Sequence, residues 1–423
     1  MTMNANTRQG KVVLLGFGMQ GKAALYDLVH NSPAREIIVA DNHPDLVSMI
    51  RSYPADRVRS VSLDAGDRNS LAALLAGADV AVESLPPRFA LGVGKIAAEV
   101  GCNLVSSMYY LNPGERDPQR IASIRRDLAD LDQKAREKGC TILTEFGMDP
   151  GIDLVLGAKA LEEFDRVDEF HSYGAGFPAP KAADNPLSYK FTWSVEGVIR
   201  SYLRPGTLVR NGEVVKVLPD EMFAAHNRHV LDLEELGSPI ECFPNGNSEH
   251  YAELFGLKGT VREMGRYSCR LPGHCEFWRR MAQCGFLNEA PIKVGDAQVS
   301  PVQFVATLLG SQEQFYFKKD EQDVAFIRID VRGLKKGQKK QVVYQLIDRR
   351  DLETGFTAMQ RTVGFTMSLG ARLMLEGKLD KHGLLLPMDV PFELVDDGLR
   401  RHGMTVTRSE TDWNGHPEGG HER

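Results

Sequence analysis

The feature that most constrains this chain is a glycine-rich turn close to its start. Residues 11–15 form an apolar run, residues 22–29 read as a helix, and between them stands Gly16-Phe17-Gly18-Met19-Gln20-Gly21. The spacing G-x-G-x-x-G between a strand and a helix is typical of a dinucleotide-binding turn. Gly16 permits the tight turn, Gly18 lets a pyrophosphate approach the backbone, and Gly21 lets the helix pack on the strand. The pattern predicts that residues 16–21 bind a dinucleotide cofactor.

An acidic residue at the end of the next strand bears on the identity of that cofactor. The apolar run 37–40 ends in Asp41, where a carboxylate accepts hydrogen bonds from the adenosine ribose hydroxyls. A 2′-phosphate about 4 Å from this carboxylate would be opposed by about 4 kcal/mol per charge pair at an effective dielectric near 20. The sequence therefore predicts NAD, with NADP less favoured. A purely steric role for the glycines is the alternative, and the order of strand, glycines, helix, strand and acid favours the cofactor.

Length and charge limit the classes of protein to which this chain can belong. A chain of 423 residues exceeds the size at which one hydrophobic core keeps growing, so we expect two domains. The net charge is −6, with acids and bases interspersed, and no stripe of Lys and Arg indicates a nucleic-acid partner. The chain has no apolar run of the roughly 18 residues that a membrane span needs, and residues 1–10 lack the apolar stretch of a signal peptide. We expect a cytoplasmic protein that does not associate with membranes.

Cysteine and histidine spacing gives no sign of a metal. The six cysteines include no C-x-x-C pair, and the eleven histidines include no H-E-x-x-H pattern. We interpret the cysteines as reduced thiols, and we predict no metal site.

The order of apolar and helical segments predicts the fold of the first part of the chain. Up to about residue 147, strand-like runs alternate with helical stretches. Such alternation is typical of an α/β fold, a Rossmann-type doubly wound parallel sheet with right-handed crossovers. We therefore interpret residues 1–147 as a dinucleotide-binding domain, completed by a helical segment at about 355–400.

The pattern of polar and apolar residues changes beyond residue 147. Two runs with a two-residue period flank residues 333–338 and predict an antiparallel hairpin. We interpret residues 148–354 as an α+β domain for substrate binding and dimerisation. Residues 409–423 are polar and Gly-rich, which predicts a disordered tail.

Three segments follow strands of the predicted parallel sheet, at 83–87, 106–110 and 147–153. Ligands of such sheets bind beyond the carboxyl ends of the strands, so these segments should face the cofactor or the substrate. Asp149 in the third segment could bind a substrate ammonium or take its proton, or it could cap a helix in an Asp-Pro-Gly turn. The stretch 184–194 places Tyr, Lys, Trp and Ser close together, although composition alone favours an ordinary loop entering a strand.

Several longer motifs resemble the saccharopine dehydrogenase (saccharopine reductase) family. The segment Gly174-Ala175-Gly176-Phe177-Pro178-Ala179-Pro180-Lys181 continues into Asp184-Asn185-Pro186-Leu187-Ser188-Tyr189-Lys190-Phe191-Thr192-Trp193-Ser194. Residues 147–153 match the family pattern Gly-x-Asp-Pro-Gly-Ile-Asp, and residues 358–364 match the start of its C-terminal helix. With the glycine turn, the resemblance spans the chain to about residue 405.

The resemblance implies roles for individual residues. The family's Thr-Leu-Arg substrate motif is best matched by Ser268-Cys269-Arg270, so Arg270 would hold a substrate carboxylate. Asp149 is the candidate for binding or deprotonating the amine, with Lys190 and His274 as reserve catalytic candidates whose alternative roles are a solvated lysine and a structural histidine. Further substrate contacts are expected from Ser107 and Tyr109. Cofactor contacts are expected, besides residues of the glycine turn and Asp41, from Asp64, Ala65, Leu85, Ser106, Met148, Pro150 and Ser194.

The resemblance also implies an activity. It is the NAD-dependent oxidative cleavage of saccharopine to L-glutamate and 2-aminoadipate 6-semialdehyde, by hydride transfer from a carbon that bears nitrogen. Members of such folds often dimerise through the second sheet, so we expect a homodimer.

One departure from the family keeps other activities open. Where saccharopine dehydrogenases carry Pro-Asn-Arg-Asp-Ser, this chain reads Pro244-Asn245-Gly246-Asn247-Ser248 and lacks a second carboxylate-binding arginine. A smaller substrate is therefore plausible, and residues 194–202 look like the related lysine 6-dehydrogenases, which deaminate the ε-carbon of lysine. The carboxynorspermidine synthases are a third and less similar branch. A non-catalytic NAD-sensing protein is the rival from another functional class.

Overall fold

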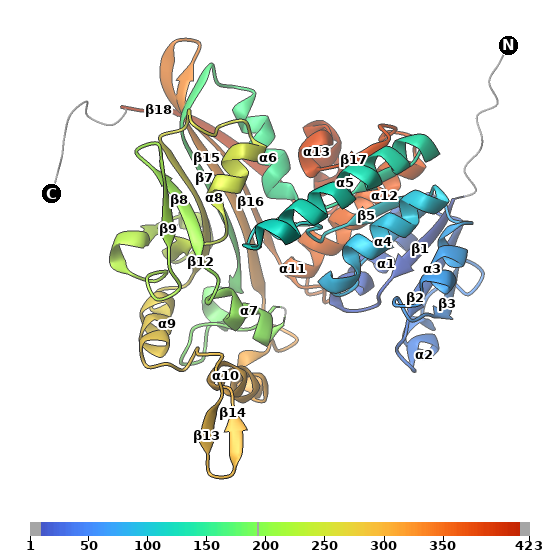
Figure 1. The fold of residues 1–423 in the computed structure, drawn as a ribbon, viewed down its shortest axis with the longest axis horizontal. Helices are drawn as coiled ribbons and strands as arrows, with labels where there is room; N and C mark the ends of the chain where they lie inside the picture. The colour runs from blue at the N-terminus through green and yellow to red at the C-terminus, as the bar shows by residue number, and fades with distance from the viewer. Residues whose placement is uncertain (1–9, 193, 415–423) are drawn as a thin grey trace. The chain divides into compact units, whose positions relative to one another are not determined.

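The computed structural model describes residues 10–192 and 194–414 (Figure 1). The chain divides into two compact units. The first runs to Val155 and includes Gln360–Gly403, and the second holds Leu156–Met359 together with the chain from Met404 onward. The predicted boundaries were residue 147 and a returning segment at about 355–400.

The first unit is built on a seven-stranded sheet with the order β17-β6-β5-β4-β1-β2-β3. All neighbouring strands in it are parallel, which confirms the predicted doubly wound sheet. Its central strands are buried on both faces, so their sequences are nearly continuous apolar runs. The strands are β1 (Lys11–Leu15), β2 (Glu36–Asp41), β3 (Val58–Ser62), β4 (Val80–Glu83), β5 (Asn103–Ser106), β6 (Thr141–Leu143) and β17 (Gly383–Leu385).

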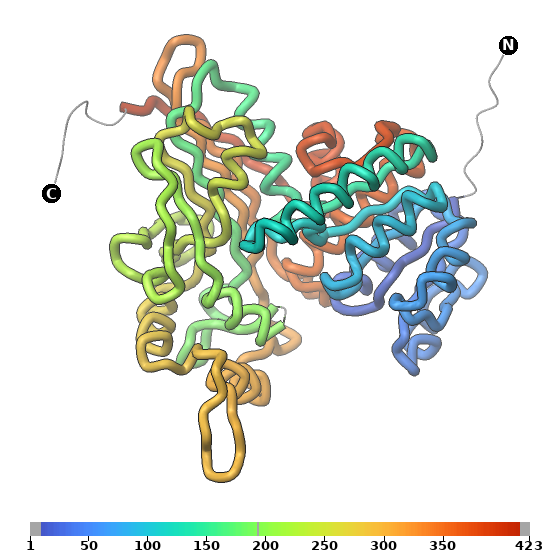
Figure 2. Tube along the Cα trace, viewed as in Figure 1, coloured from blue at the N-terminus to red at the C-terminus, as the bar shows by residue number. Residues whose placement is uncertain are grey.

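Helices cover both faces of this sheet. Local sequence signals set their ends: Asp67 caps α3 by accepting from two backbone N–H groups, and Gly101 ends α4 in the left-handed conformation. Figure 2 shows the late part of the chain, in orange, beside the early strands and helices, in blue, because α12 packs against α1, β4 and β5. The helices are α1 (Met19–Asn31), α2 (Leu46–Ile50), α3 (Arg68–Leu75), α4 (Pro87–Val100), α5 (Pro118–Lys138), α6 (Ile152–Leu161, which spans the boundary), α12 (Thr366–Leu375) and α13 (Phe392–Arg400).

The second unit is built on a nine-stranded mixed sheet, which fits the predicted α+β class. Its main path is β10-β11-β12-β7-β15-β16-β18, and β8 joins it by pairing with β12 and β9. Among the described strands of this sheet, β7 and β12 alone pair in parallel. The strands are β7 (Arg166–Pro178), β8 (Gly206–Arg210), β9 (Glu213–Val217), β10 (His229–Leu231), β11 (Ile240–Pro244), β12 (Glu263–Arg270), β15 (Asp323–Lys335), β16 (Gln338–Arg349) and β18 (Val406–Asp412).

The predicted hairpin is confirmed as β15 and β16. Lys336 and Gly337 connect the two strands, and both have positive φ, as a two-residue turn of type I′ requires. Short helices and a second, small hairpin complete the unit. They are α7 (Val195–Ser201), α8 (Ser248–Leu254), α9 (His274–Gln283), α10 (Pro301–Gly310), α11 (Ala358–Gln360), β13 (Ile292–Val294) and β14 (Ala297–Val299).

The predicted disordered tail at 409–423 is wrong for its first residues. Residues 409–412 belong to β18, which pairs antiparallel with β16. The segment is polar because β18 is an edge strand with exposed side chains, and its order comes from backbone pairing and from ion pairs of Arg408 and Glu410 with Glu163 and Lys335. Residues 415–423 lie outside the described part of the chain. No helix among the described residues is both long and apolar enough to span a bilayer.

Candidate functional site

The glycine turn has the geometry that a dinucleotide needs. Gly16 has φ +90°, and a Cβ atom there would lie 2.6 Å from the carbonyl oxygen of Ser84. A Cβ atom at Gly21 would collide with the carbonyl oxygen of Gly16. At Gly18, in contrast, a Cβ atom would meet nothing within 4 Å. Packing within the protein explains the first and last glycines, whereas the middle one leaves open space beside the backbone.

The first turn of α1 faces the same space. Gly18 is the N-cap of this helix, and no side chain caps its N–H groups. No acidic residue lies in the first turn, so an anion there would meet the positive end of the helix without competition. These residues fit the pyrophosphate of a dinucleotide.

Asp41 lies directly beside the glycine turn. Its carboxylate accepts hydrogen bonds from the backbone N–H of Phe17 at 2.7 Å and of His43 at 2.8 Å. Because β1 and β2 are parallel neighbours, the end of β2 brings the acid to the turn that follows β1. The sequence spacing predicted this proximity.

The remaining predicted cofactor residues of the first unit follow other strands of the sheet. Asp64 and Ala65 follow β3, and Leu85 follows β4. Ser106 ends β5, and Ser107 and Tyr109 come directly after it. Since the strands are parallel, all of these positions lie at the carboxyl edge of one sheet.

A buried carboxylate lies at this edge, at the start of the predicted ligand-facing segment 83–87, although the sequence did not identify it as a site residue. Glu83, the last residue of β4, is fully buried and accepts hydrogen bonds from Ser106 Oγ at 2.5 Å and from the N–H of Leu85 at 2.8 Å. Burial raises its pKa to about 7. Glu83 thus ties together two loops that carry predicted cofactor contacts. The signal in the sequence is an acid that ends an otherwise apolar buried strand.

The turn at 147–153 follows β6 and is tightly wound. Gly147 donates its N–H to the carbonyl of Pro150, and its own carbonyl accepts from Ile152. A Cβ atom at Gly151 would collide with the backbone of Gly147, which explains the glycine. Since α6 begins at Ile152, Asp149 lies in the turn before the helix, and Asp153 accepts from the N–H of Gly151. Met148, Asp149 and Pro150 therefore share the edge with Ser107.

In the second unit, Arg270 is a buried cation. Only 6% of the residue is exposed, and its guanidinium carbon lies 5.1 Å from the ring centre of Tyr189 and 6.0 Å from that of Phe243. Nη1 donates to the carbonyl of Cys269 at 2.8 Å, and Nε is buried without a hydrogen-bond partner. Among the residues that the structure describes, no carboxylate forms an ion pair with Arg270.

His274 lies in the same aromatic cluster as Arg270. Its Nε2 is 2.9 Å from the hydroxyl oxygen of Tyr202, and its ring is edge-on to that of Tyr189 at 5.4 Å. Burial, together with the charge of Arg270, lowers the pKa of His274 well below its usual range. The imidazole is thus neutral at physiological pH, and its packing agrees with the structural alternative stated for it.

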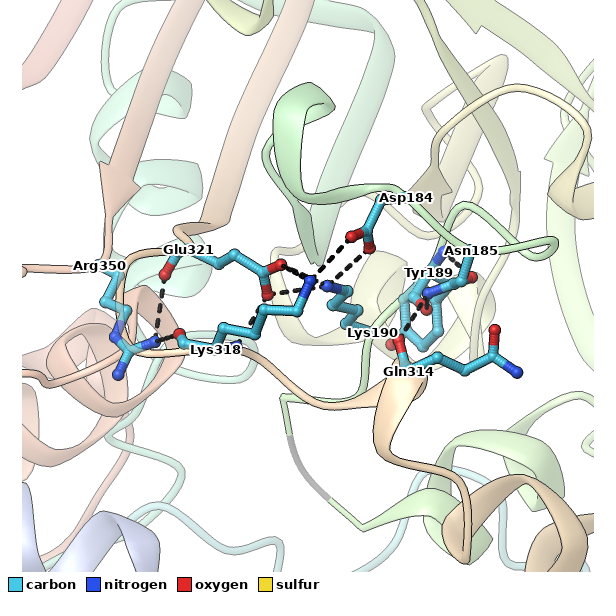
Figure 3. Close-up of polar contacts among 8 residues, drawn as sticks. All are labelled: Asp184, Asn185, Tyr189, Lys190, Gln314, Lys318, Glu321 and Arg350. Carbon is cyan, nitrogen blue, oxygen red and sulfur yellow. Dashed lines mark hydrogen bonds and ion pairs between the residues drawn. The ribbon is translucent and has the colours of Figure 1, made fainter.

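Lys190 is also buried, but its charge is fully paired. Its Nζ lies 2.8 Å from Asp184 Oδ1 and 2.7 Å from Glu321 Oε2, and 1% of the side chain is exposed (Figure 3). It is therefore not the solvated lysine of the alternative stated for it. Ser194, in contrast, is exposed and caps α7, where its Oγ accepts from Gly197 N–H at 3.2 Å.

Apart from Ser194, the structure thus gathers the predicted residues into two sets. Those of the first unit lie at one sheet edge, and Arg270 and His274 of the second unit lie around Tyr189, the neighbour of Lys190 in the chain. No group of three or more His, Cys, Asp or Glu side chains in residues 10–192 and 194–414 is placed to hold a metal ion.

Comparison with known proteins gives matches along nearly the whole chain. The model of the saccharopine dehydrogenase NADP binding domain matches residues 12–143, and that of the saccharopine dehydrogenase C-terminal domain matches residues 147–403. The mitochondrial alpha-aminoadipic semialdehyde synthase of Bos taurus is 25% identical over 95% of this chain. This chain spans 48% of that relative's length.

A fungal relative and two solved structures agree with these matches. The saccharopine dehydrogenase [NADP(+), L-glutamate-forming] of Pyricularia oryzae is 24% identical, with 78% of this chain and 83% of the relative covered. The apo saccharopine dehydrogenase (L-Glu forming) of Saccharomyces cerevisiae superposes with a TM-score of 0.80 at 21% identity, covering 95% of this chain and 99% of that one. The homospermidine synthase of Legionella pneumophila, solved in complex with NAD, gives 0.63 at 13% identity, covering 98% and 95%. The two structural likenesses concern the fold.

Proposed function

The chain belongs to the saccharopine dehydrogenase family, and from this premise we propose that it is a pyridine-nucleotide-dependent oxidoreductase acting on a carbon–nitrogen bond of an amino acid. The preferred reaction is the oxidative cleavage of saccharopine to L-glutamate and 2-aminoadipate 6-semialdehyde. The observation that carries the substrate class is Arg270, a buried guanidinium without a carboxylate partner among the described residues. A substrate carboxylate would supply the missing negative charge.

We propose NAD as the cofactor, although the fungal relatives are named for NADP(+). Asp41 supports NAD, because its carboxylate is fixed beside the glycine turn by the N–H of Phe17. Residues 41–45 and 63–67 include four aspartates and no Lys or Arg that could pair with a 2′-phosphate. A 2′-phosphate would be repelled by these carboxylates, because like charges about 4 Å apart repel by about 4 kcal/mol at an effective dielectric near 20.

The chemistry assigns each set of residues a task. When bound, the cofactor accepts a hydride from the carbon that bears nitrogen. The glycine turn and Asp41 hold the dinucleotide, and Arg270 fixes a carboxylate of the substrate. Asp149 binds the amine or takes the proton that the nitrogen loses. Water then cleaves the resulting carbon–nitrogen double bond, which releases the amine product and the aldehyde.

Oxidation of L-lysine at its ε-carbon is the second candidate function. At position 246 the family's arginine is replaced by glycine, which adopts φ +82° and lets its carbonyl accept from Thr207 N–H. Saccharopine carries three carboxylates and lysine carries one, so the loss of an arginine favours the smaller substrate. Carboxynorspermidine-like chemistry and NAD sensing without catalysis are the alternatives left if neither saccharopine nor lysine is turned over.

Initial rates of NADH or NADPH formation with saccharopine and L-lysine, each with NAD and NADP, test the proposal. We expect turnover with saccharopine and a higher kcat/KM with NAD. Turnover with lysine alone would replace the first reaction by the second. Absence of turnover with both substrates, despite measurable binding of NADH, would overturn both. We further propose that the enzyme is a cytoplasmic homodimer, and sedimentation velocity of the purified chain tests the dimer.

A further inference from the structure

The second unit contains a closed cluster of four charged side chains, Asp184, Lys190, Lys318 and Glu321, which we call the lysine clamp. Lys190 Nζ contacts Asp184 Oδ1 at 2.8 Å, Glu321 Oε1 at 2.8 Å and Glu321 Oε2 at 2.7 Å (Figure 3). An ammonium group has three N–H donors, and three carboxylate oxygens take them. Lys190 therefore has no donor left for a substrate.

The two lysines of the clamp share the same two carboxylates but differ in burial. Lys318 Nζ lies 3.1 Å from Asp184 Oδ2 and 3.3 Å from Glu321 Oε1. Its side chain is 66% exposed, against 1% for Lys190. Solvent screens the contacts of Lys318. The side chain of Lys190 is buried, and its partners Glu321 and Asp184 are 11% and 46% exposed.

The clamp joins two segments that are far apart in the sequence. Residues 184–191 are held to residues 314–321 by the contact of Lys190 with Glu321 and by two further bonds. Asn185 Nδ2 donates to the carbonyl of Gln314 at 3.0 Å, and the N–H of Phe191 donates to the carbonyl of Phe315 at 2.9 Å. Arg350 supports the second segment by donating to the carbonyls of Lys318 and Glu321. Both segments are thus fixed by several polar contacts, most of which are partly buried.

The residue that this arrangement places is Tyr189, the neighbour of Lys190. Asn185 holds the backbone of Tyr189 by donating to its carbonyl at 2.8 Å (Figure 3). The tyrosine ring is 2% exposed, and it packs against both the guanidinium of Arg270 and the ring of His274. A shift of the clamped segment would move the tyrosine ring away from Arg270.

We propose that Lys190 is a positioning residue that holds Tyr189 against Arg270, and that it acts on the substrate site through this contact. The inference rests on the proposed function in one respect, namely that Arg270 receives a substrate carboxylate. As a general base, Lys190 would have to lose a proton and leave Asp184 and Glu321 with only the exposed Lys318 as a counter-charge. The paired geometry supports the positioning role.

The test compares Lys190→Met with Lys318→Met in the whole 423-residue chain. The replacement removes the charge in both cases and keeps a long side chain, so the exposed lysine is a matched control. The rate of hydrogen exchange of the amides in residues 187–191 measures how firmly the lysine clamp holds this segment. The rate at which phenylglyoxal modifies Arg270, followed by peptide mass, measures how well the guanidinium is shielded from solvent. We expect Lys190→Met to speed both by about tenfold or more, and Lys318→Met to leave both within about twofold of the wild type.

Kinetics separate positioning from catalysis. For Lys190→Met we expect KM for the carboxylate substrate to rise about tenfold or more while kcat and its pH profile stay within about threefold of the wild type. A collapse of kcat with unchanged KM and loss of one limb of the pH profile would overturn the proposal and identify Lys190 as the base.

The exchange and modification readouts need no turnover, so they decide the proposal even if the wild type proves inactive on both substrates. Unchanged exchange and unchanged Arg270 reactivity in folded Lys190→Met would overturn it. If this variant does not fold, Glu321→Gln carries the test, because the amide keeps one acceptor oxygen for Lys190. Faster exchange in Glu321→Gln supports the proposal, and exchange equal to that of the wild type overturns it.

Discussion

The second unit contains two buried cations, Lys190 and Arg270, and different kinds of neighbouring groups surround their charges. Lys190 is surrounded by carboxylate oxygens of Asp184 and Glu321, whereas Arg270 is surrounded by aromatic rings and a backbone carbonyl. A buried charge without a partner is costly unless another molecule supplies one. The difference separates a side chain whose charge is paired within the fold from one that we propose to bind a substrate carboxylate, although both are buried basic residues.

The comparison predicts its largest effect at Lys190. Breaking a buried ion pair from one side costs about 3–5 kcal/mol. Lys190→Met should lower the free energy of unfolding by about 3 kcal/mol, the lower end of this range, because Asp184 is 46% exposed and both carboxylates still contact Lys318. The matched change at the exposed Lys318 should cost less than about 1 kcal/mol. Urea unfolding followed by circular dichroism measures both. Equal losses for the two variants would contradict the distinction that we draw from burial.

The first unit contains a third buried ionisable group, the acid Glu83, whose pKa is shifted by burial. Glu83 has a pKa of about 7, above its ordinary 4.5, because it is buried. Between these values the folded state binds more protons than the unfolded state, so the free energy of unfolding should fall as pH rises through this interval, by about 3 kcal/mol in all.

The stabilising contribution of the protonated Glu83 is complete below about pH 4.5 and is lost above about pH 7. Glu83→Gln carries no charge at either pH, so its unfolding free energy should vary less over this range than that of the wild type. Chemical denaturation at a series of pH values compares the two proteins. Parallel pH profiles would show that Glu83 does not titrate in this window.

Replacing Arg270 should lower catalytic efficiency strongly but change the free energy of unfolding little. A charged hydrogen bond contributes about 1.5–3 kcal/mol, so Arg270→Met should lower kcat/KM by roughly 10- to 150-fold, mainly through KM. Because no carboxylate among the described residues pairs with Arg270, the same change should alter the free energy of unfolding by less than about 1 kcal/mol. Steady-state rates and urea unfolding on one preparation check both. A large loss of stability would place Arg270 with Lys190, as a structural cation.

The sequence predicted the first unit in most of its detail. The glycine turn, the acid of Asp41 and the alternation of strands and helices are local signals, and parallel pairing places them at one edge of the sheet. The properties of Glu83 could be predicted only in part. The sequence shows an acid at a strand end, but it shows neither the burial that raises the pKa of Glu83 nor the hydrogen bond from Ser106.

The second unit was less predictable, since its contacts join distant segments. The order of residues 409–412 depends on pairing with β16, more than 60 residues away. The role of Lys190 likewise depends on Glu321, 131 positions later in the chain.

The sequence by itself determined the dinucleotide fold, the family and the residue types available for binding, because these depend on local periodicity and on motifs that fold within a few turns. Only the tertiary structure decided which buried charges are already paired. Pairing is set by the distance between side chains from remote segments, because an ion pair requires contact and the interaction between exposed charges is largely screened beyond about 10 Å at 0.1 M salt. Lys190 and Arg270 therefore look alike as basic residues in the chain and differ once it is folded.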